Sequence, residues 1–244
     1  MRLTRCHVDL RLEAGSEIVL PEEAANHLLR VLRLAEGDAC VLFNGDGQDY
    51  PATITLAAKR EARVRLGAPE TVDRESPRSI VLLQGIARGE KMDLILQKAT
   101  ELGVASVLPV NAERTEVKLE GARLEKRIAH WRSVIVSACE QSGRARVPTL
   151  ATPRTLVEAA ASVPANALKL TLDPLGEYRL STLQADADTP VVVAIGPEGG
   201  WSPRDRQALE KSGFQGLRLG PRILRTETAG LAAIAALQAR LGDL

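Results

Sequence analysis

Residues 191–202 read V-V-V-A-I-G-P-E-G-G-W-S, and residues 217–230 read L-R-L-G-P-R-I-L-R-T-E-T-A-G. Each stretch begins with a short apolar run typical of a strand and then turns sharply at a Gly-Pro pair. The glycines of such loops let the backbone approach a neighbouring group closely, because they carry no Cβ. In an open α/β sheet, ligands bind beyond the carboxyl ends of the strands. The two stretches therefore predict a ligand site built from two loops at the ends of neighbouring strands.

The composition is typical of a globular protein and argues against several classes of site. The 244 residues are 45% hydrophobic and 26% charged, and the net charge of +1 does not indicate the kind of partner. Trp, Tyr and Phe occur twice each, too few for an RNA groove lined with stacking aromatic rings. The three cysteines and three histidines show no metal-ligand spacing, so we expect no metal. Without a signal peptide or an apolar run of ~18 residues, we expect a cytoplasmic protein with no membrane partner.

The first part of the chain alternates short apolar strands with turns and contains one expected helix over residues 21–32. The turn N-G-D-G at residues 44–47 separates two β runs, which is a strong hairpin signal. Several short strands with a single helix favour a small β-barrel. Residues 68–78 are charged, hold two prolines and have Val72 as a lone branched apolar residue, and they are the expected linker.

Strands alternate with helices after this linker. We expect strands over residues 80–83, 104–110 and 168–172, and helices over residues 90–102, 120–141 and 226–240. Because parallel strands are joined by crossover helices, this alternation predicts a parallel sheet that is covered on both faces. The expected fold is therefore α/β, with a barrel domain over residues 1–72 and a sheet domain over residues 73–244.

The common nucleotide-binding motifs do not occur at the first strand of this second domain. A dinucleotide fold needs G-x-G-x-x-G there, whereas residues 84–89 read Q-G-I-A-R-G. The sequence also has neither a P-loop nor a G-x-S-x-G nucleophile elbow. The glycine loops instead follow the last two strands.

Two long motifs carry a resemblance to a known family. G-P-E-G-G-W-S at residues 196–202 and L-G-P-R-I-L-R-T-E-T-A at residues 219–229 are similar to motifs of the SPOUT class of RNA methyltransferases. Within that class they most resemble the RsmE-type enzymes, which methylate N3 of a uridine in 16S ribosomal RNA of the small subunit. Shorter stretches match the same family in the right order: R-V-L-R-L at 30–34, F-N-G-D-G at 43–47, K-A-T-E-L-G-V at 98–104 and A-C-E-Q-S-G-R at 138–144.

The resemblance implies features that the residue pattern alone does not predict. In this class the C-terminal segment threads through an earlier loop and forms a trefoil knot. S-adenosylmethionine binds in the loops of that knot, and no metal is needed. The resemblance also implies a PUA-like RNA-binding barrel over residues 1–72, a SPOUT-type α/β knot over residues 73–244, and a homodimer in which the partner subunit borders each active site.

The same resemblance assigns the cofactor to the three loops that follow strands and to the start of the last helix. Leu172, Ile223 and Leu224 are the residues expected to pack against the adenine. The full set of expected cofactor-binding residues is Leu172, Asp173, Pro174, Gly196, Pro197, Gly199, Gly200, Leu219, Gly220, Arg222, Ile223, Leu224, Thr228 and Ala229.

Three charged residues are catalytic candidates. The uridine N3 carries a proton, so methyl transfer is helped by a base or by a cation that stabilises the anionic uracil. Arg225 directly follows the cofactor loop and is the first candidate for that cation, with a phosphate contact or a salt bridge as an equal alternative. Glu198 and Glu227 are the acidic candidates, and for each the simpler alternative is to accept loop or helix N–H bonds.

Five further residues are candidates for contact with RNA. Arg5, Arg30 and Arg33 in the barrel are expected either to bind phosphates or to be ordinary surface charges. Gln141 and Arg144 lie where Gly143 predicts the end of the long helix, so they would project toward RNA or toward the partner's active site. For this pair the alternative is simple capping of the helix.

Two other functions remain open from the sequence. A ribose 2′-O-methyltransferase of the same class would share the knot but attack with a hydroxyl, and a non-catalytic RNA-binding assembly factor would share only the fold. The motif at residues 219–229 and the barrel before the knot favour the base methyltransferase. The intact glycine loops argue against a protein without catalysis.

Overall fold

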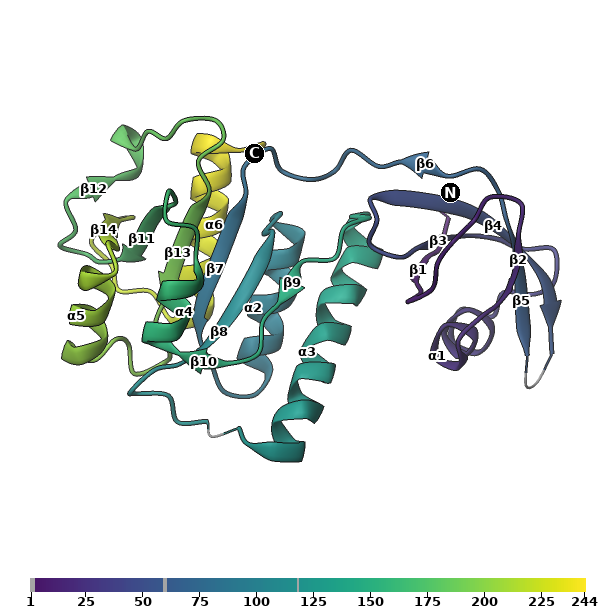
Figure 1. The fold of residues 1–244 in the computed structure, drawn as a ribbon, viewed down its shortest axis with the longest axis horizontal. Coiled ribbons are helices and arrows are strands. Elements are labelled where there is room, and N and C mark those ends of the chain that lie inside the picture. Colours follow the sequence, from purple (N-terminus) through teal and green to yellow (C-terminus); the bar gives the residue numbers. More distant parts are fainter. Residues whose placement is uncertain (1–2, 59–60, 118) are drawn as a thin grey trace. The chain divides into compact units, whose positions relative to one another are not determined.

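The computed structural model describes residues 3–58, 61–117 and 119–244. It divides into two compact units (Figure 1). The first holds residues 1–75 together with residues 136–147, and the second holds residues 76–135 and 148–244.

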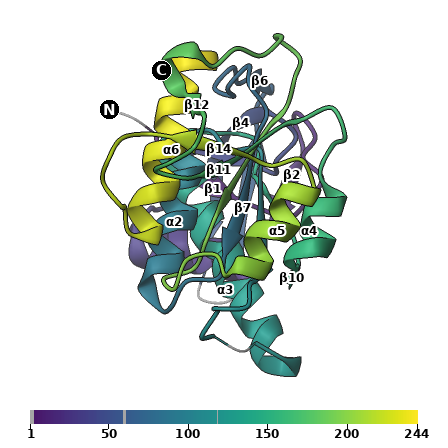
Figure 2. The same ribbon diagram turned by 90° about the vertical axis from the view of Figure 1, so that its left-hand side faces the viewer.

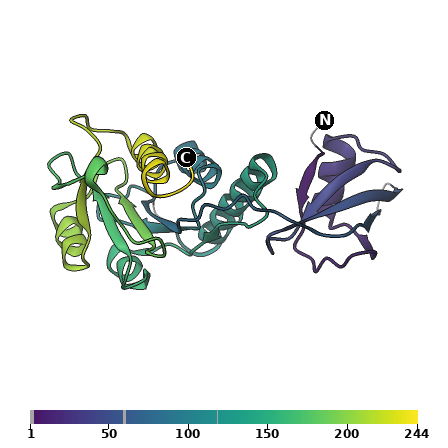
Figure 3. The same ribbon diagram turned by 90° about the horizontal axis from the view of Figure 1, so that it is seen from above.

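The first unit is a curved β-sheet wrapped around its own apolar core (Figure 3). Its strand order is β1-β3-β4-β5-β2, and β6 pairs with β4. Along β5, Ala62, Val64 and Leu66 are buried while the two arginines between them are exposed, the alternation of a half-buried strand. The small β module that the turns predict is therefore confirmed. Its strands are β1 (Arg5–His7), β2 (Glu17–Val19), β3 (Ala39–Phe43), β4 (Gln48–Ala57), β5 (Ala62–Leu66) and β6 (Glu70–Thr71).

Two parts of the first unit differ from the expectation. The expected helix over residues 21–32 is one turn of α1 (Glu22–Ala25) followed by a π-helical segment η1 (Asn26–Val31). The expected linker, residues 68–78, contributes β6 to the sheet. Neither feature has a signal in the hydrophobic pattern: burial of Ala24 and Leu28 fits either kind of helix, and β6 is formed by backbone pairing with Gln48 and Asp49 of β4.

The end of α3 (Gly121–Ser142) also belongs to the first unit. The guanidinium of Arg5 donates to the carbonyls of Cys139 at 2.9 Å and Arg144 at 3.3 Å. The backbone N–H of His7 donates to the Glu140 carboxylate at 3.0 Å. The expected barrel domain, residues 1–72, lacks this segment because helical periodicity does not tell which strands a helix end contacts.

The second unit is a parallel sheet with helices on both faces, as predicted. Its strand order is β10-β8-β7-β13-β11-β14-β12, and β9 pairs with β8. Helices α2 and α6 cover one face, and α4 and α5 cover the other (Figure 2). The strands are β7 (Ile80–Gly85), β8 (Ser106–Asn111), β9 (Thr149–Leu150), β10 (Arg154–Thr155), β11 (Leu168–Leu172), β12 (Tyr178–Arg179), β13 (Val191–Ile195) and β14 (Gln215–Arg218). The helices are α2 (Glu90–Glu101), α4 (Leu156–Ser162), the 3₁₀ turn η2 (Leu180–Thr182), α5 (Pro203–Lys211) and α6 (Thr226–Leu241).

The burial of the central strands explains why they appear in the sequence as continuous apolar runs. Every residue of β7 and of β13 is buried, as expected for parallel strands covered on both faces. Helix α2 buries Met92, Ile95, Leu96 and Ala99 along one face. Nowhere in the described ranges does a helix combine the length and the apolar character that crossing a bilayer requires.

A chain crossing occurs at the last strand. β14 lies between β11 and β12, and both Leu172 and Tyr178 are in register with Leu217. The short loop from β11 to β12 must therefore pass over a face of β14. It does so where Gly176 meets Gly216, since a Cβ on Gly216 would lie 2.9 Å from the Gly176 Cα. A late strand thus runs beneath an earlier loop, which is the threading that the expected knot requires.

Candidate active site

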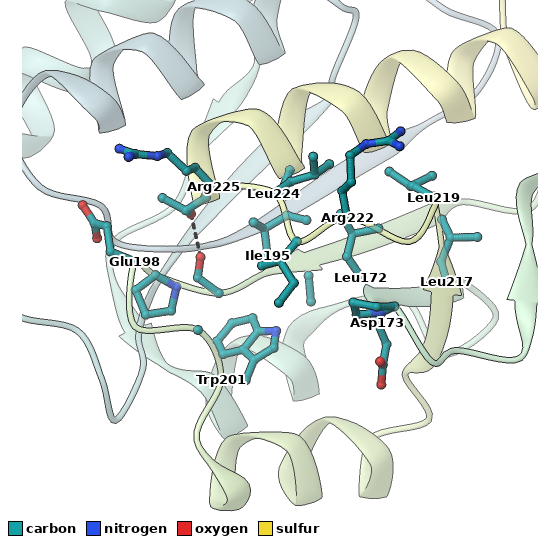
Figure 4. Close-up of a pocket in the computed structure, with 18 of the residues that line it drawn as sticks. Leu172, Asp173, Ile195, Glu198, Trp201, Leu217, Leu219, Arg222, Leu224 and Arg225 are labelled. Atoms are coloured by element: carbon teal, nitrogen blue, oxygen red, sulfur yellow. Dashed lines mark hydrogen bonds between the residues drawn. The ribbon is translucent and has the colours of Figure 1, made fainter.

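A cavity of about 390 Å³ opens at the carboxyl ends of β11, β13 and β14 (Figure 4). Its volume lies in the range of small-molecule sites, roughly 300–1,000 Å³. The walls are the three loops that follow these strands, residues 172–174, 196–201 and 219–225, together with the first turn of α6. The two glycine-containing stretches therefore meet at one site, where the strand pattern predicts a ligand.

All the residues expected to bind the cofactor line this cavity, with the exception of Thr228. Thr228 lies on α6 with an exposed side chain, while Thr226 and Ala229 line the cavity. The helical repeat explains the difference, because residues three apart share a face and Thr228 lies off it. The residues that do line the cavity are Leu172, Asp173, Pro174, Gly196, Pro197, Gly199, Gly200, Leu219, Gly220, Arg222, Ile223, Leu224 and Ala229.

The middle of the cavity is apolar and its charges lie around the outside. Figure 4 shows Leu172, Ile195 and Leu224 at the centre, with the charged ends of Arg222 and Asp173 directed away from them. Ile223, which was expected to pack against an adenine, has a side chain that is 90% exposed. Ile195, at the end of β13, occupies the apolar centre that was assigned to Ile223.

Several lining residues are not among those predicted from the sequence. Trp201 is 6% exposed, and its indole N–H donates to the Thr171 hydroxyl at 3.1 Å. The position of Trp201 directly after Gly199-Gly200 was the sequence signal that could have predicted its place in the lining. Strand-terminal positions were a second signal, because side chains at strand ends face the loops above them. The other unpredicted lining residues are Ala194, Ile195, Arg206, Leu217 and Thr226.

Glycine is required at the positions of the first loop for different physical reasons. A Cβ on Gly196 would lie 3.1 Å from the Gly200 Cα, and one on Gly199 would lie 3.0 Å from the Arg114 Cβ. These two glycines are therefore needed for packing inside the protein. Gly200 has φ +65° and open space beside it, so its backbone conformation favours glycine and leaves room for a ligand.

Glu198 anchors the glycine loop to the loop that follows β7. Its carboxylate accepts the Arg88 backbone N–H at 3.0 Å and the Lys91 ammonium at 3.4 Å. Burial raises the pKa of Glu198, but the hydrogen bonds to its ionised form outweigh burial and hold that pKa below its usual value of 4.5. The sequence left two roles open for Glu198, proton transfer and acceptance of N–H bonds. In the structure its carboxylate accepts an N–H bond. An ionised carboxylate of low pKa is also a weak base.

The other two catalytic candidates have opposite surroundings. Glu227 does not line the cavity, and its Oε2 is buried with no hydrogen-bond partner among the described residues. Arg225 lies at the cavity rim immediately before α6, and its side chain is exposed. In the described part of the chain, no carboxylate forms an ion pair with Arg225, so the salt-bridge alternative is not observed. Figure 4 places Arg225 on the same side of the cavity as Glu198.

Two of the five RNA-contact candidates lie inside the first unit. Arg5 pairs with Asp49 and lies 4.4 Å from the ring centre of Phe43, and its side chain is almost fully buried. Arg144 is likewise buried and pairs with Glu75. Neither presents its guanidinium to a phosphate, because both serve the packing of α3 against the barrel. The remaining candidates, Arg30, Arg33 and Gln141, are exposed.

Metal ligands do not gather in the described residues. No group of three or more His, Cys, Asp or Glu side chains lies close enough together there to hold an ion.

Two family models match the chain in the order that the structure suggests. Residues 20–67 match an RNA methyltransferase PUA domain, and residues 74–238 match an RNA methyltransferase domain. The PUA-like and SPOUT-type fold classes expected from the sequence are thereby confirmed.

Curated relatives match over almost their full length. Ribosomal RNA small subunit methyltransferase E of Buchnera aphidicola (subsp. Schizaphis graminum) is 30% identical over 243 residues, which cover 100% of this chain and 98% of the relative. The protein of the same name from Mycobacterium bovis is 31% identical over 234 residues, covering 94% and 89% respectively.

Solved structures match the whole fold. Ribosomal RNA small subunit methyltransferase E of Neisseria gonorrhoeae, bound to S-adenosylmethionine, has a TM-score of 0.94 at 39% identity and covers 99% of each chain. A putative methyltransferase of Legionella pneumophila, in complex with the same cofactor, has a TM-score of 0.95 at 37% identity and covers 100% of each chain. With its family domain, its curated relatives and its fold in agreement, the chain belongs to the ribosomal RNA small subunit methyltransferase E family of RNA methyltransferases.

Proposed function

We propose that the protein is an S-adenosylmethionine-dependent methyltransferase that methylates N3 of a uridine in 16S ribosomal RNA of the small subunit. The observation that carries the proposal is the cavity between the two glycine loops, which is lined by nearly all the residues expected to hold the cofactor. Two structural relatives with the same fold are described as bound to S-adenosylmethionine, which supports that choice of cofactor.

The residues present fit such a cofactor. Leu172, Ile195 and Leu224 form an apolar centre suited to an adenine ring, and the open side of Gly200 leaves backbone accessible beside it. Asp173 and Arg222 at the rim can meet its polar and charged ends. When bound, S-adenosylmethionine supplies a methyl group on a positively charged sulfur, which a nucleophile takes by in-line displacement.

The chain's own contribution to methyl transfer is then positioning and charge. The loops and the buried Trp201 exclude water from one side of the site, which strengthens electrostatic interactions there. Arg225 at the rim stabilises the negative charge that develops on the uracil when N3 loses its proton. Glu198 remains ionised and holds the glycine loop in place.

The remaining assignments follow from the same proposal. The barrel, residues 1–72, holds ribosomal RNA, with Arg30, Arg33 and Gln141 as exposed contacts, and residues 73–244 carry out catalysis. The match of residues 20–67 to an RNA methyltransferase PUA domain supports this division. We also propose a homodimer whose partner subunit borders each active site, acting in the cytoplasm where its ribosomal substrate is found.

Isothermal titration of the purified protein with S-adenosylmethionine tests the proposed cofactor. We expect one site per chain and the same affinity with and without EDTA, because the apolar centre and the charged rim of the cavity can hold a sulfonium cofactor without a metal ion. A parallel incubation with labelled cofactor and small-subunit RNA is expected to transfer the label to the RNA. An absence of cofactor binding, or binding that EDTA abolishes, would contradict the proposal.

A further inference from the structure

The segment of residues 84–91, which spans the last two residues of β7, the loop that follows and the first two residues of α2, has no assigned role. Its sequence does not fit a dinucleotide motif, and none of its residues lines the cavity. It nevertheless contacts the segments that do line the cavity at three separate places. These contacts connect residues 84–91 to the segments that form the walls of the cavity.

The first contact is between backbones. A Cβ on Gly85 would lie 2.5 Å from the Pro197 nitrogen and 2.6 Å from the Pro197 Cδ. Real Cβ atoms are not found so close to backbone atoms, so only glycine permits this approach. The loop after β7 therefore supports the first glycine loop directly.

The second contact is the carboxylate of Glu198, which accepts the Arg88 backbone N–H at 3.0 Å. Lys91, in the first turn of α2, adds its ammonium at 3.4 Å. A hydrogen bond between an ionised carboxylate and a backbone N–H is stronger than one between neutral groups. It ties the middle of the glycine loop to the same support.

The third contact is a buried relay of hydrogen bonds. Gln84 is 0% exposed, and its side-chain N–H₂ donates to the Gly85 carbonyl at 2.8 Å and to the Thr226 hydroxyl at 3.1 Å. The Thr226 hydroxyl donates in turn to the Gly196 carbonyl at 2.6 Å, the dashed line in Figure 4.

The direction of this relay is determined by its ends. The Gly85 and Gly196 carbonyls can only accept hydrogen bonds. The Gln84 amide nitrogen is therefore the donor to Gly85 and to Thr226, and the Thr226 hydroxyl donates its one proton to Gly196. Three segments far apart in sequence, namely β7, the glycine loop and the start of α6, are thereby joined at one hydroxyl.

We infer that Gln84 and Thr226 are positioning residues for methyl transfer. Thr226 directly follows Arg225 at the cavity rim, so its bond to Gly196 sets the spacing between the two loops that enclose the cavity. The relay also sets where the Arg225 backbone lies relative to the glycine loop. This inference rests on the proposed function, because it concerns how that cofactor site is held ready.

Loss of the hydroxyl would remove the Thr226 partner of the Gly196 carbonyl and of one N–H of the Gln84 amide, whose other N–H still donates to the Gly85 carbonyl. The loops would then relax into arrangements that do not bind the cofactor, and the apparent affinity falls with the fraction of binding-competent molecules. A change the size of one buried hydrogen bond corresponds to about a tenfold loss.

The test compares Thr226→Val with Thr226→Ser and a matched control. Valine keeps the shape of threonine without the hydroxyl, and serine keeps the hydroxyl. Thr100→Val is the control, because Thr100 is also fully buried and donates to a helix carbonyl, Leu96, at 2.8 Å. For each variant we would measure the S-adenosylmethionine Kd by calorimetry, the turnover of RNA methylation, and the Tm.

We expect Thr226→Val to weaken cofactor binding about tenfold and to lower turnover at saturating cofactor, with Thr226→Ser within about twofold of wild type. Thr100→Val should lose a similar amount of Tm with wild-type affinity. Wild-type affinity and turnover in Thr226→Val would overturn the inference, as would equal losses of affinity in both valine variants.

A second variant keeps the inference testable if Thr226→Val does not fold. Gln84→Met removes the amide that orients the hydroxyl and has similar length, and a several-fold weaker Kd is expected. Wild-type affinity in that variant would overturn the inference. Failure of the wild-type protein to bind S-adenosylmethionine at all would instead contradict the proposed function, so the two failures are distinguishable.

Discussion

The charged residues around the cavity separate by what each contacts. Glu198 is engaged by a backbone N–H and by Lys91, whereas Glu227 lies off the cavity lining. Arg225 and Arg222 both line the cavity with exposed side chains and have no carboxylate partner in the described chain, but Arg225 is the one that lies on the same side of the cavity as Glu198. At an effective dielectric constant of about 20, a cation about 4 Å from an anion stabilises it by about 4 kcal/mol. A positive charge there suits a reaction in which uracil becomes negative.

Arg225→Ala is expected to lower the rate of RNA methylation by about 10²–10³-fold, the effect of removing one group that stabilises a developing charge. The cofactor Kd should change by less than about threefold. Single-turnover methylation with saturating cofactor measures the rate, and calorimetry measures the Kd.

The matched control for this arginine is Arg204→Ala. The Arg204 side chain is 88% exposed near the start of α5 and does not line the cavity, so both quantities should stay at wild-type values. Equal losses of rate and cofactor affinity in Arg225→Ala would move Arg225 from catalysis to cofactor binding.

Individual residues show where sequence reasoning stops. Loop residues such as Pro197 and Leu224 were predicted because they belong to the two long motifs that carry the family resemblance. Thr226 was missed and Thr228 was chosen, although the helical repeat separates them, because a motif does not tell which face of a helix meets the loops. Arg5 and Arg144 were predicted to contact RNA, whereas both are buried, because burial of an arginine depends on distant partners such as Asp49 and Glu75.

Pairs of elements rather than single elements shape the site. The strands and helices of the sheet domain were predictable from apolar periodicity, because each pattern is contained in its own segment. The close approach of Gly85 to Pro197 and of Gly176 to Gly216 was not predictable. Each joins residues far apart in sequence or on crossing segments, and a glycine in a sequence does not name what it approaches.

The bridge between the glycine loop and the loop after β7 leads to a pH-dependent prediction. Hydrogen bonds to the ionised form keep the pKa of Glu198 below 4.5, so the charge-assisted bridge to Arg88 and Lys91 is at full strength above that pH and weakens to a neutral hydrogen bond as the pH falls through the lowered pKa. We expect cofactor affinity to fall with acid in that range for wild type, with no such step in Glu198→Gln.

Near neutral pH, Glu198→Gln should retain most of its turnover, because the amide oxygen still accepts the Arg88 N–H. Glu198→Ala removes the acceptor and should weaken cofactor binding. Glu116→Gln is the control, since Glu116 is exposed and forms an ion pair with the side chain of Arg88. A loss of about 100-fold in the turnover of Glu198→Gln with unchanged affinity would identify Glu198 as a base instead.

The whole molecule combines two units with separate tasks in the proposed function. The sheet unit carries the cavity at the ends of β11, β13 and β14, directly beside the crossing of β14. Threading and the proposed cofactor binding therefore use the same loops. Of the two residues in the motif A-C-E-Q-S-G-R that were expected to reach RNA or a partner subunit, Gln141 is exposed, whereas Arg144 is buried and, with Glu140, holds the end of α3 in the first unit. That outcome depends on tertiary contacts which no local pattern records.

The position of the methyl group on the RNA distinguishes the proposed base methyltransferase from the two alternative functions. Mass spectrometry of nucleosides and fragments from 16S ribosomal RNA, taken from cells with and without the gene, measures it directly. Loss of one methyl group from the base of a single uridine, restored by the wild-type gene and not by Arg225→Ala, is the predicted result. Loss of a ribose methyl group would identify a 2′-O-methyltransferase, and unchanged methylation would contradict an enzymatic role in this RNA.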